Sequence, residues 1–304
     1  MISANRERAV VLGGSVAGLL AARVLADRYA GVTVVERDRL PSGAQHRRGL
    51  PHGRHVHGML PRGRQILEEL MPGLTRQVLA AGGLTGDVLA DIRWYLNGRM
   101  LRRADTGLTA LSASRPLIEA VIRQRVLALP NVTVLDGHDV TGLCAAPDGG
   151  RITGAVVGGR TGEGRRTLPA DLVVDATGRG SRTPRWLADL GYPPPAVDRV
   201  FVDLSYSSCV FAGADGAFGD DLVVVTARFP GQGRSAVMQR LEGGRVLVTL
   251  AGVLGERPPD TLDGFARYAD TLAAPDTAAV IRAGGRSARR PRSGIRPTSG
   301  AGTS

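Results

Sequence analysis

The chain has 304 residues, which is enough for one large domain or two modest ones around a hydrophobic core. Its apolar content of 43% is ordinary for a globular protein, and no apolar run approaches the roughly 20 residues of a membrane-spanning helix. All 39 basic residues are arginine and the net charge is +11, but only 4% of the residues are aromatic, too few for a surface that stacks nucleic-acid bases. We therefore predict neither a membrane span nor a nucleic-acid partner.

The N-terminal residues and the cysteines indicate an ordinary intracellular protein. The first ten residues carry charge and lack an apolar stretch before a cleavage site, so no signal peptide is predicted and a cytoplasmic location is expected. Cys144 and Cys209 lie far apart without metal-ligand spacing, which favours two small buried side chains over a metal or redox site. No metal site is predicted.

The first predicted elements form a βαβ unit. Residues 9–13 and 32–36 are short apolar runs typical of buried strands, and residues 16–29 have apolar positions at helical spacing. A strand, a glycine turn, a helix and a second strand within about 30 residues predict a parallel pair of strands.

The turn of this βαβ unit matches a dinucleotide-binding fingerprint. Its candidate cofactor-binding residues are Gly13, Gly14, Ser15, Ala17 and Gly18. The first glycine permits the tight turn, the small Ser15 leaves room for a pyrophosphate, and Gly18 lets the helix pack against the strand. The N-terminus of the helix offers N–H groups and a positive dipole to phosphates. The alternative is a purely structural glycine turn, which the strand–turn–helix–strand order disfavours.

Glu36 ends the second strand, at about the 20-residue spacing expected for a carboxylate that binds ribose hydroxyls. A carboxylate there would repel a 2′-phosphate, which favours FAD or NAD over NADP. Arg37 beside it works against that preference, and both residues are candidates for cofactor binding.

The remaining elements alternate between α/β and antiparallel patterns. Residues 37–64 are dense in charge, proline and glycine, which predicts an irregular loop that covers a ligand. Asn97-Gly98 is a favoured two-residue turn, so residues 91–101 should form a hairpin. The other predicted helices are residues 65–70, 114–129, 261–272 and 276–281. The other predicted strands are residues 132–135, 151–157, 167–168, 171–175, 222–229, 235–241 and 245–252, of which the last three suggest an antiparallel meander.

Three segments carry a family pattern: VVLGGSVAGLLAARVLADR with VTVVERD at residues 10–38, SRPLIEAVIR at 114–123, and DLVVDATGRGSRTPRWL at 171–187. Together they resemble the FAD-dependent oxidoreductases of the group A flavoprotein monooxygenase type, which include aromatic hydroxylases and flavin epoxidases. The segment RRGLPHGRHVHGML at 47–60 is similar to the loop of that family that runs near the flavin. The likeness spans roughly residues 9–281.

The resemblance implies FAD as the cofactor, NAD(P)H as a transient reductant, and transfer of one oxygen atom of O₂ to an apolar or aromatic small molecule of secondary metabolism. It implies cofactor contacts at Arg47, Arg115, Val140, Asp175 and Gly178, with the backbone of Val140 at the adenine. One of the loop arginines Arg47, Arg48 and Arg54 is expected to pair with the pyrophosphate through a bidentate contact. No catalytic side chain is named, because the cofactor carries the chemistry. The substrate, the oligomeric state and the choice between NADH and NADPH are left open.

With this resemblance, the expected fold class is α/β: a Rossmann-like FAD-binding domain of the glutathione reductase type with an inserted antiparallel β-sheet substrate domain. We expect the FAD-binding domain at residues 1–88 and 113–190, and the substrate sheet at residues 89–112 and 191–282. Residues 283–304 should form a disordered basic tail, because Ile295 is their only large aliphatic residue.

One departure from the family pattern concerns the flavin end of the site. The family carries a later Gly-Asp motif whose aspartate holds the ribityl chain, and after Gly178 the only such pair is Gly219-Asp220, placed before a predicted strand of the substrate sheet. Since the pattern also stops at Ala283, we hypothesise a truncated or frameshifted product of a longer gene. The alternatives to an active monooxygenase are a non-catalytic or impaired FAD-binding fragment and a flavin-dependent prenyl-chain reductase.

Several polar and aromatic residues allow two interpretations. His46, His52, His55 and His57 cluster in one loop. The arginines between them disfavour a metal site, so we interpret the segment as a polar loop without a metal. Asp175 ends a predicted buried strand, where a cofactor contact and the capping of a turn are equally compatible with the sequence. Trp94 and Tyr95 should point to opposite faces of their strand, and both are expected to pack in a sheet or core rather than against a substrate.

Overall fold

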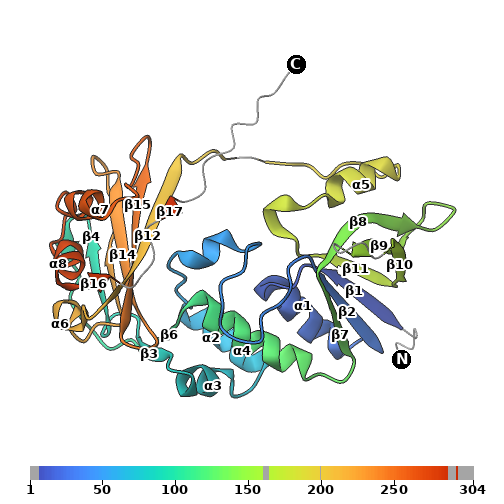
Figure 1. Ribbon diagram of the computed structural model, residues 1–304, viewed down its shortest axis with the longest axis horizontal. Coiled ribbons are helices and arrows are strands. Elements are labelled where there is room, and N and C mark those ends of the chain that lie inside the picture. Colours follow the sequence, from blue (N-terminus) through green and yellow to red (C-terminus); the bar gives the residue numbers. More distant parts are fainter. Residues whose placement is uncertain (1–6, 160–163, 199, 287–291, 294–304) are drawn as a thin grey trace. The chain divides into compact units, whose positions relative to one another are not determined.

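The computed structural model describes residues 7–159, 164–198, 200–286 and 292–293 of the chain. The chain divides into two compact units (Figure 1). The first unit comprises residues 1–51 and 118–199, and the second comprises residues 52–117 and 200–304. The predicted fold class, α/β with additional antiparallel sheet, is confirmed.

The limits of the two units differ from the expected domain boundaries. Residues 52–88, which the sequence analysis assigns to the FAD-binding domain, lie in the second unit. The reason is local pairing, because β3 (Leu84–Asp87) pairs with β6 (Thr109–Ser112) of the same unit. The second boundary falls within the helix α4 (Arg115–Leu127), whose first residues belong to the second unit.

Four parallel strands form the central sheet of the first unit, in the order β11-β1-β2-β7. Their bounds are Arg8–Leu12 for β1, Gly31–Glu36 for β2, Val132–Asp136 for β7 and Leu172–Asp175 for β11. β1 lies between β2 and β11, and its residues Ala9 to Leu12 are all buried. Burial on both faces explains why this strand is an uninterrupted apolar run.

Two layers cover this parallel sheet. The helix α1 (Val16–Ala26) packs against β1 and β2, with Leu19 and Ala22 fully buried. A three-stranded antiparallel sheet, β10-β9-β8, contributes Ala155 and Val157 to a core that contains Val10 and Leu12 of β1. The bounds of its strands are His138–Ala145 for β8, Ile152–Gly159 for β9 and Arg166–Pro169 for β10. The unit also contains the short turn η2 (Gly178–Gly180) and the helix α5 (Thr183–Asp189).

The second unit is built on a large sheet in the order β16-β12-β15-β14-β13-β4-β5, with β17 paired to β12. The bounds are Ile92–Leu96 for β4, Arg99–Met100 for β5, Leu204–Ala212 for β12, Val223–Thr226 for β13, Arg234–Leu241 for β14, Arg245–Val253 for β15, Gly285–Arg286 for β16 and Arg292–Ser293 for β17. The predicted meander is β13, β14 and β15, which pair antiparallel in that order. The predicted hairpin at Asn97-Gly98 joins β4 to β5, and both turn residues have positive φ.

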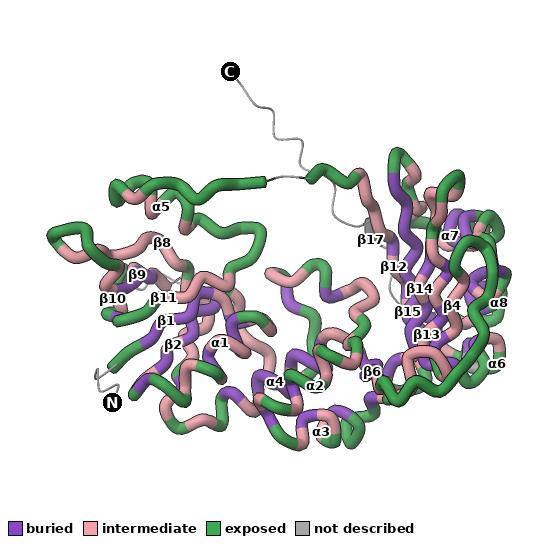
Figure 2. The backbone as a smooth tube through the Cα atoms, turned by 180° about the vertical axis from the view of Figure 1, so that it is seen from behind, coloured by how far each residue is buried: buried purple, intermediate pink, exposed green. Residues whose placement is uncertain are grey.

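Helices cover one face of this sheet. Phe265 of α7 (Leu262–Ala269) and Val280 of α8 (Asp276–Ala283) lie in one core with Phe211, Met238 and Val248 of the strands. The short helix α6 (Asp215–Phe218) joins the same core through Phe218. Figure 2 shows how buried residues concentrate in the strands of this sheet and in the helices beside it. The segment that follows residue 54 lies against the opposite face of the sheet.

The predicted irregular loop of residues 37–64 contains more regular structure than expected. A short 3-10 turn, η1 (Pro51–Arg54), is followed by α2, which spans Pro61–Leu70 rather than beginning at residue 65. The proline at the start of α2 costs no hydrogen bond there, because the first N–H groups of a helix have no partner within it. The sequence analysis also missed α3 (Leu74–Ala80), along with β3, β6, β8, β12, α5 and α6.

The expected disordered tail needs a correction where the structure describes it. β16 and β17, within the predicted tail, pair with β12 through residues 285–286 and 292–293. Residues 287–291 and 294–304 lie outside the described residues. Among the helices that the structure describes, none has the length and apolar character to cross a membrane.

Candidate functional site

The glycine turn of the first unit leaves no room for side chains. Gly13 has φ of +101°, and a Cβ there would lie 2.6 Å from the carbonyl oxygen of Ala176. A Cβ on Gly18 would overlap the carbonyl oxygen of Gly13. The N-terminus of α1 has no side-chain cap at Ser15 and no acidic residue in its first turn. The turn therefore brings bare backbone and the positive end of a helix to the carboxyl end of β1.

Glu36 lies directly against this turn. It is only 6% exposed, and its Oε2 accepts a hydrogen bond of 2.8 Å from the backbone N–H of Gly14. Its Oε1 accepts a second bond of 2.9 Å from the N–H of Asp38. The structure thus places the predicted ribose-binding carboxylate beside the predicted phosphate-binding turn and fixes its orientation, while its role toward a cofactor stays a prediction.

Arg47 occupies the centre of a buried ion-pair cluster. Its Nη1 lies 3.2 Å from Glu36 Oε2 and its Nη2 lies 2.7 Å from Glu119 Oε1, with Asp38 at 3.6 Å. Burial alone would lower the pKa of Arg47, but the carboxylates of Glu119 and Glu36 raise it above its usual value. Arg47, a candidate for cofactor binding, is therefore ion-paired with three carboxylates beside the glycine turn.

Glu119 is the residue of this cluster that the sequence analysis missed. Its Oε2 accepts a hydrogen bond of 2.9 Å from Ser15 Oγ, so one carboxylate joins the glycine turn to Arg47. One turn later on α4, Arg123 donates to the carbonyl oxygens of Pro41 and Gly43, at 2.7 and 3.0 Å. A signal was present, because a Glu–Arg pair four residues apart on an otherwise apolar stretch of helix predicts a buried pair with partners elsewhere.

Asp175 organises the turn that follows β11. It accepts hydrogen bonds from the N–H and the hydroxyl of Thr177, at 2.8 and 2.5 Å, and from the hydroxyl of Ser181. Partial burial raises the pKa of Asp175, but the hydrogen bonds from Ser181, Thr177 and Thr183 outweigh it and lower the pKa below its usual value. Of the two interpretations of this residue, the turn-capping contacts are present, and the cofactor contact stays a prediction.

The other cofactor candidates lie in varied surroundings. Gly178 begins η2 with φ of +72°. Val140 pairs with Val157 in the antiparallel sheet and packs on the core of the first unit. Arg37 is exposed, and Arg115 is the first residue of α4, in the second unit. Their roles toward a cofactor stay predictions.

Residues 55 and 56 of the predicted histidine loop are hydrogen-bonded to the large sheet of the second unit. His55 Nδ1 lies 2.8 Å from Ser208 Oγ, Ser208 Oγ lies 2.6 Å from Thr249 Oγ1, and the N–H of Val56 donates to that same threonine. Burial and the neighbouring histidines lower the pKa of His55. In the part of the chain that the structure describes, no group of histidine, cysteine and acidic side chains could hold a metal ion.

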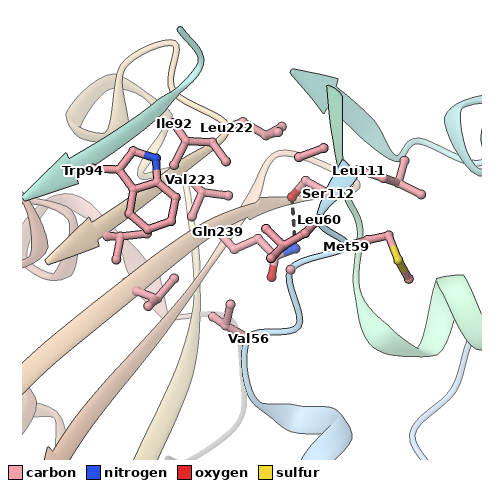
Figure 3. Close-up of a pocket in the computed structure, with 14 residues that line it drawn as sticks. Val56, Met59, Leu60, Ile92, Trp94, Leu111, Ser112, Leu222, Val223 and Gln239 are labelled. Carbon is pink, nitrogen blue, oxygen red and sulfur yellow. Dashed lines mark hydrogen bonds between the residues drawn. The ribbon is translucent and has the colours of Figure 1, made fainter. Parts of the chain in front are cut away.

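An apolar pocket of about 140 Å³ lies between this segment and the face of the sheet that the helices leave free. Figure 3 shows Val56, Met59, Ile92, Trp94, Leu222 and Val223 around it, with Ser112 and Gln239 as its polar side chains. Trp94 lines the pocket, whereas Tyr95 packs against the core beneath the helices, so the predicted opposite orientation is confirmed. Trp94 also packs against the buried side chains of Ile92, Ala110 and Leu222, as expected of a residue that packs in the sheet.

A family model described as FAD dependent oxidoreductase matches residues 9–184 of this chain. The chain belongs to this family. The match covers the glycine turn, Glu36, the Arg47 cluster and the Asp175 turn, and it confirms that the chain is an FAD-dependent oxidoreductase, with FAD as the predicted cofactor.

The chain also resembles individual proteins. It is 38% identical over 288 residues to Protein Rv3254 of Mycobacterium tuberculosis; the alignment covers 88% of this chain but only 58% of that protein. The crystal structure of PqsL, a probable FAD-dependent monooxygenase from Pseudomonas aeruginosa, matches 96% of this chain and 73% of its own with a TM-score of 0.69 and 20% identity. PnpA, a p-nitrophenol 4-monooxygenase from Pseudomonas putida, matches 82% of this chain and 58% of its own with a TM-score of 0.59 and 19% identity. The two structures show a shared fold.

Proposed function

We propose that this chain is the FAD-binding and substrate-binding part of a flavin-dependent monooxygenase or epoxidase that uses NAD(P)H and acts on an apolar or aromatic small molecule. The observation that carries the proposal is the glycine turn of the first unit with Glu36 bonded to its backbone. The apolar pocket of the second unit provides surface for an apolar substrate.

The residues of the first unit fit the adenosine half of FAD. The cradle at Gly13 and Gly18 is closed to any side chain, and the N-terminus of α1 carries neither a side-chain cap nor an acidic residue in its first turn. Such a terminus suits a pyrophosphate, and Glu36 at the end of β2 suits the ribose hydroxyls. When bound, FAD would supply the redox chemistry by which NAD(P)H, O₂, a proton and the substrate yield NAD(P)⁺, an oxygenated product and water.

The side chains of this chain would bind and orient the cofactor and the substrate. Arg47 holds Glu36 against the turn and balances its charge through an ion pair of 3.2 Å, and Glu119 holds Arg47 from the other side at 2.7 Å. In the second unit, the apolar walls around Trp94 and Leu222 exclude water from whatever the pocket binds. Neither set of residues includes a group that must accept or donate a proton.

The similar proteins support a small aromatic substrate. PqsL has been crystallised with 2-aminobenzoylacetate, and the name of PnpA gives p-nitrophenol as its substrate. Because the chain spans 58% of the length of Protein Rv3254 and lacks the later Gly-Asp motif, an FAD-binding part without activity of its own is the second candidate.

The test compares cofactor binding and turnover in the purified chain. We expect added FAD to be retained and to show a protein-bound flavin spectrum, and NADPH oxidation in air to rise when a suitable aromatic compound is present. Mass spectrometry with isotopically heavy dioxygen should then find one labelled oxygen atom in the product. FAD binding without NADPH oxidation would support the second candidate, an FAD-binding part without activity of its own. A folded chain that does not bind FAD would contradict both candidate functions.

A further inference from the structure

One wall of the apolar pocket is an irregular segment, residues 55–60, which we call the strap. It lies between η1 and α2 and belongs to no helix or strand. The strap residues that line the pocket are Val56, Gly58, Met59 and Leu60. Because no regular element includes the strap, separate contacts fix its position, and such segments open more readily than the elements around them.

Two anchors attach the strap to the rest of the second unit. At the first anchor, the N–H of Val56 donates to Thr249 Oγ1 at 3.1 Å. At the second anchor, the N–H of Leu111 donates to the carbonyl oxygen of Met59 at 2.9 Å. The first anchor depends on side chains, whereas the second is a bond between two backbone groups. Only the first can therefore respond to the protonation of a side chain.

The residues between the anchors are held loosely. The carbonyl oxygen of His57 accepts one long hydrogen bond of 3.4 Å from Gln239 Nε2. Gly58 is exposed, and a Cβ there would meet no atom within 4 Å. Glycine adopts more backbone conformations than any other residue, so Gly58 can serve as a hinge between the two anchors.

The first anchor fixes the tautomer of His55. Ser208 Oγ lies 2.8 Å from His55 Nδ1 and 2.6 Å from Thr249 Oγ1. Thr249 Oγ1 already accepts the N–H of Val56, and among the described residues its own hydroxyl proton has no acceptor other than Ser208. Thr249 therefore donates to Ser208, Ser208 donates to His55 Nδ1, and the neutral imidazole carries its proton on Nε2.

A second proton on His55 disturbs this arrangement. A charged imidazole carries an N–H on both nitrogens, so Nδ1 can then only donate to Ser208. Whichever way the two hydroxyl groups turn, one hydroxyl proton of Ser208 or Thr249 is left without an acceptor. Thr249 is only 5% exposed, and a buried donor without a partner is unfavourable.

The surroundings of His55 also disfavour its charged form. Burial lowers the pKa of His55 most, and the charges of His57 and His52 lower it further. On the sheet, the ring of Tyr206 lies 5.7 Å from that of His55, and β17 brings Arg292 beside this part of β12. No acidic side chain of the described residues is among the causes that shift this pKa, so none offsets the positive charges.

We propose that the strap is a pH-sensitive wall of the pocket: neutral His55 holds the first anchor in place, and protonated His55 releases it, so that the strap turns about Gly58. His55 is thus a positioning residue that acts on the wall through Ser208 and Thr249. A released strap exposes His55 to water, where it binds a proton more readily, so protons favour release. The anchor is intact above the pKa of a free histidine and weakens as the pH falls below it. This response belongs to the pocket wall and goes beyond the proposed function, because it requires neither cofactor nor substrate.

Hydrogen–deuterium exchange detected by NMR distinguishes the two anchors. The amides of Val56 and Leu111 are followed in the purified chain at about pH 7.5 and about pH 5, on either side of the pKa of a free histidine. Each measured rate is divided into the intrinsic rate at the same pH to give a protection factor. We expect the protection factor of Val56 to fall about five- to tenfold at the lower pH, and that of Leu111 to stay within about twofold.

Two variants test whether His55 is the group that responds. His55→Asn places an uncharged amide oxygen near the position of Nδ1, so Ser208 keeps an acceptor, and Val56 should stay protected at both pH values. Ser208→Ala interrupts the first anchor and should leave Val56 poorly protected at both. Ser205→Ala is the control on the same strand, because its hydroxyl donates instead to the carbonyl oxygen of Glu256 at 3.1 Å, and it should keep the pH response.

Trp94 reports whether release of the anchor opens the pocket. The chain has two tryptophans, and Trp186 lies in α5 of the first unit, so Trp186→Phe leaves Trp94, which lines the pocket, as the only tryptophan. Quenching of its fluorescence by acrylamide should increase at the lower pH. The same increase should be absent when His55→Asn is added to this protein.

Equal protection of Val56 at the two pH values would overturn the proposal, and so would a pH response that survives in His55→Asn. Parallel loss of protection at Val56 and Leu111 would overturn it as well, because the whole unit would then loosen rather than the strap. Acrylamide quenching that does not change with pH would show that the wall stays in place. These measurements need neither FAD nor turnover, so their failure is distinguishable from a failure of the proposed function.

Discussion

The glycine turn of the first unit and the pocket of the second unit present surfaces of different chemistry to a ligand. The turn offers backbone and charge: Gly13 and Gly18 admit no side chain, and Glu36, Arg47 and Glu119 form a buried ionic cluster beside them. The pocket is lined mainly by apolar side chains, with Ser112 and Gln239 as its polar side chains. The first arrangement suits the ribose and pyrophosphate of a dinucleotide, and the second suits a neutral ring.

The two regions should also differ in how they respond to substitution. Removing one member of a buried ionic cluster leaves the other charges without compensation, whereas trimming the wall of an existing cavity enlarges a space that is already there. Matched substitutions in each region therefore test this difference.

Arg47→Leu should have the largest effect. It leaves Glu36 and Glu119, which are buried with it, without their common cation, and we expect the free energy of unfolding to fall by about 3–5 kcal/mol. Urea unfolding measures this. Arg39→Leu is the control, because its ion pair with Asp136 is 3.5 Å long and its side chain is 74% exposed, so a loss of under about 1 kcal/mol is expected. Equal losses in the two variants would show that the Arg47 cluster is not structurally important.

Gly18→Ala tests the close approach in the glycine turn. Its Cβ would overlap the carbonyl oxygen of Gly13, so α1 must shift, and we expect a loss of about 1–3 kcal/mol together with weaker FAD binding. Gly43→Ala in the same unit places a Cβ in open space and should change neither property by a measurable amount. Urea unfolding and FAD titration of both variants provide the measurement, and unchanged FAD affinity in Gly18→Ala would count against the proposed cradle.

Substitution of two neighbouring valines of β13 compares how tightly the two faces of the large sheet are packed. Val224 is 1% exposed in the core beneath the helices, whereas Val223 lines the pocket. Val224→Ala should cost about 2 kcal/mol of unfolding free energy, and Val223→Ala less than about 1 kcal/mol, because its methyl groups border a cavity. Chemical unfolding of the pair measures the difference; an equal cost at both positions would mean that the pocket wall is packed as tightly as the core.

The smallest effect concerns His55. Burial, followed by the charges of His57 and His52, lowers its pKa below the usual value, so the folded protein binds this proton less readily than the unfolded chain. The stability that His55 contributes is present above the pKa of an unfolded histidine and is lost as the pH falls through the lower pKa of the folded state. An NMR titration should show the lowered pKa, and His57→Gln should raise it part of the way back; a wild-type pKa at or above that of a free histidine would contradict this.

The glycine turn was predictable because its signal is local. The strand, the glycines, the helix and Glu36 follow one another within a short stretch, and their spacing reflects backbone geometry that every such turn shares. The hairpin at Asn97-Gly98 was predictable for the same reason, since positive φ at both positions selects these residues.

The ionic cluster and the pocket depend on contacts between distant parts of the chain. Arg47 meets Glu119 across 72 residues, and Gln239 meets Ser112 across 127 residues, so no spacing rule links them. The pocket gathers two or three residues from each of the strands β4, β6, β13 and β14, and each strand satisfies an ordinary strand pattern. β12 was missed because its serines and tyrosine interrupt the apolar alternation; the structure shows Ser208 bonded to His55 and Thr249.

Our central proposal is that the first unit recognises the adenosine and pyrophosphate part of FAD. Isothermal titration of the purified chain with FAD and with FMN, which lacks the adenosine half, tests that claim. We predict one FAD bound per chain, at least about a hundredfold more tightly than FMN, and competition from ADP, because Glu36 and the turn of Gly13 to Gly18 are proposed to bind only that half. Equal affinities for FAD and FMN, or no competition by ADP, would contradict the account.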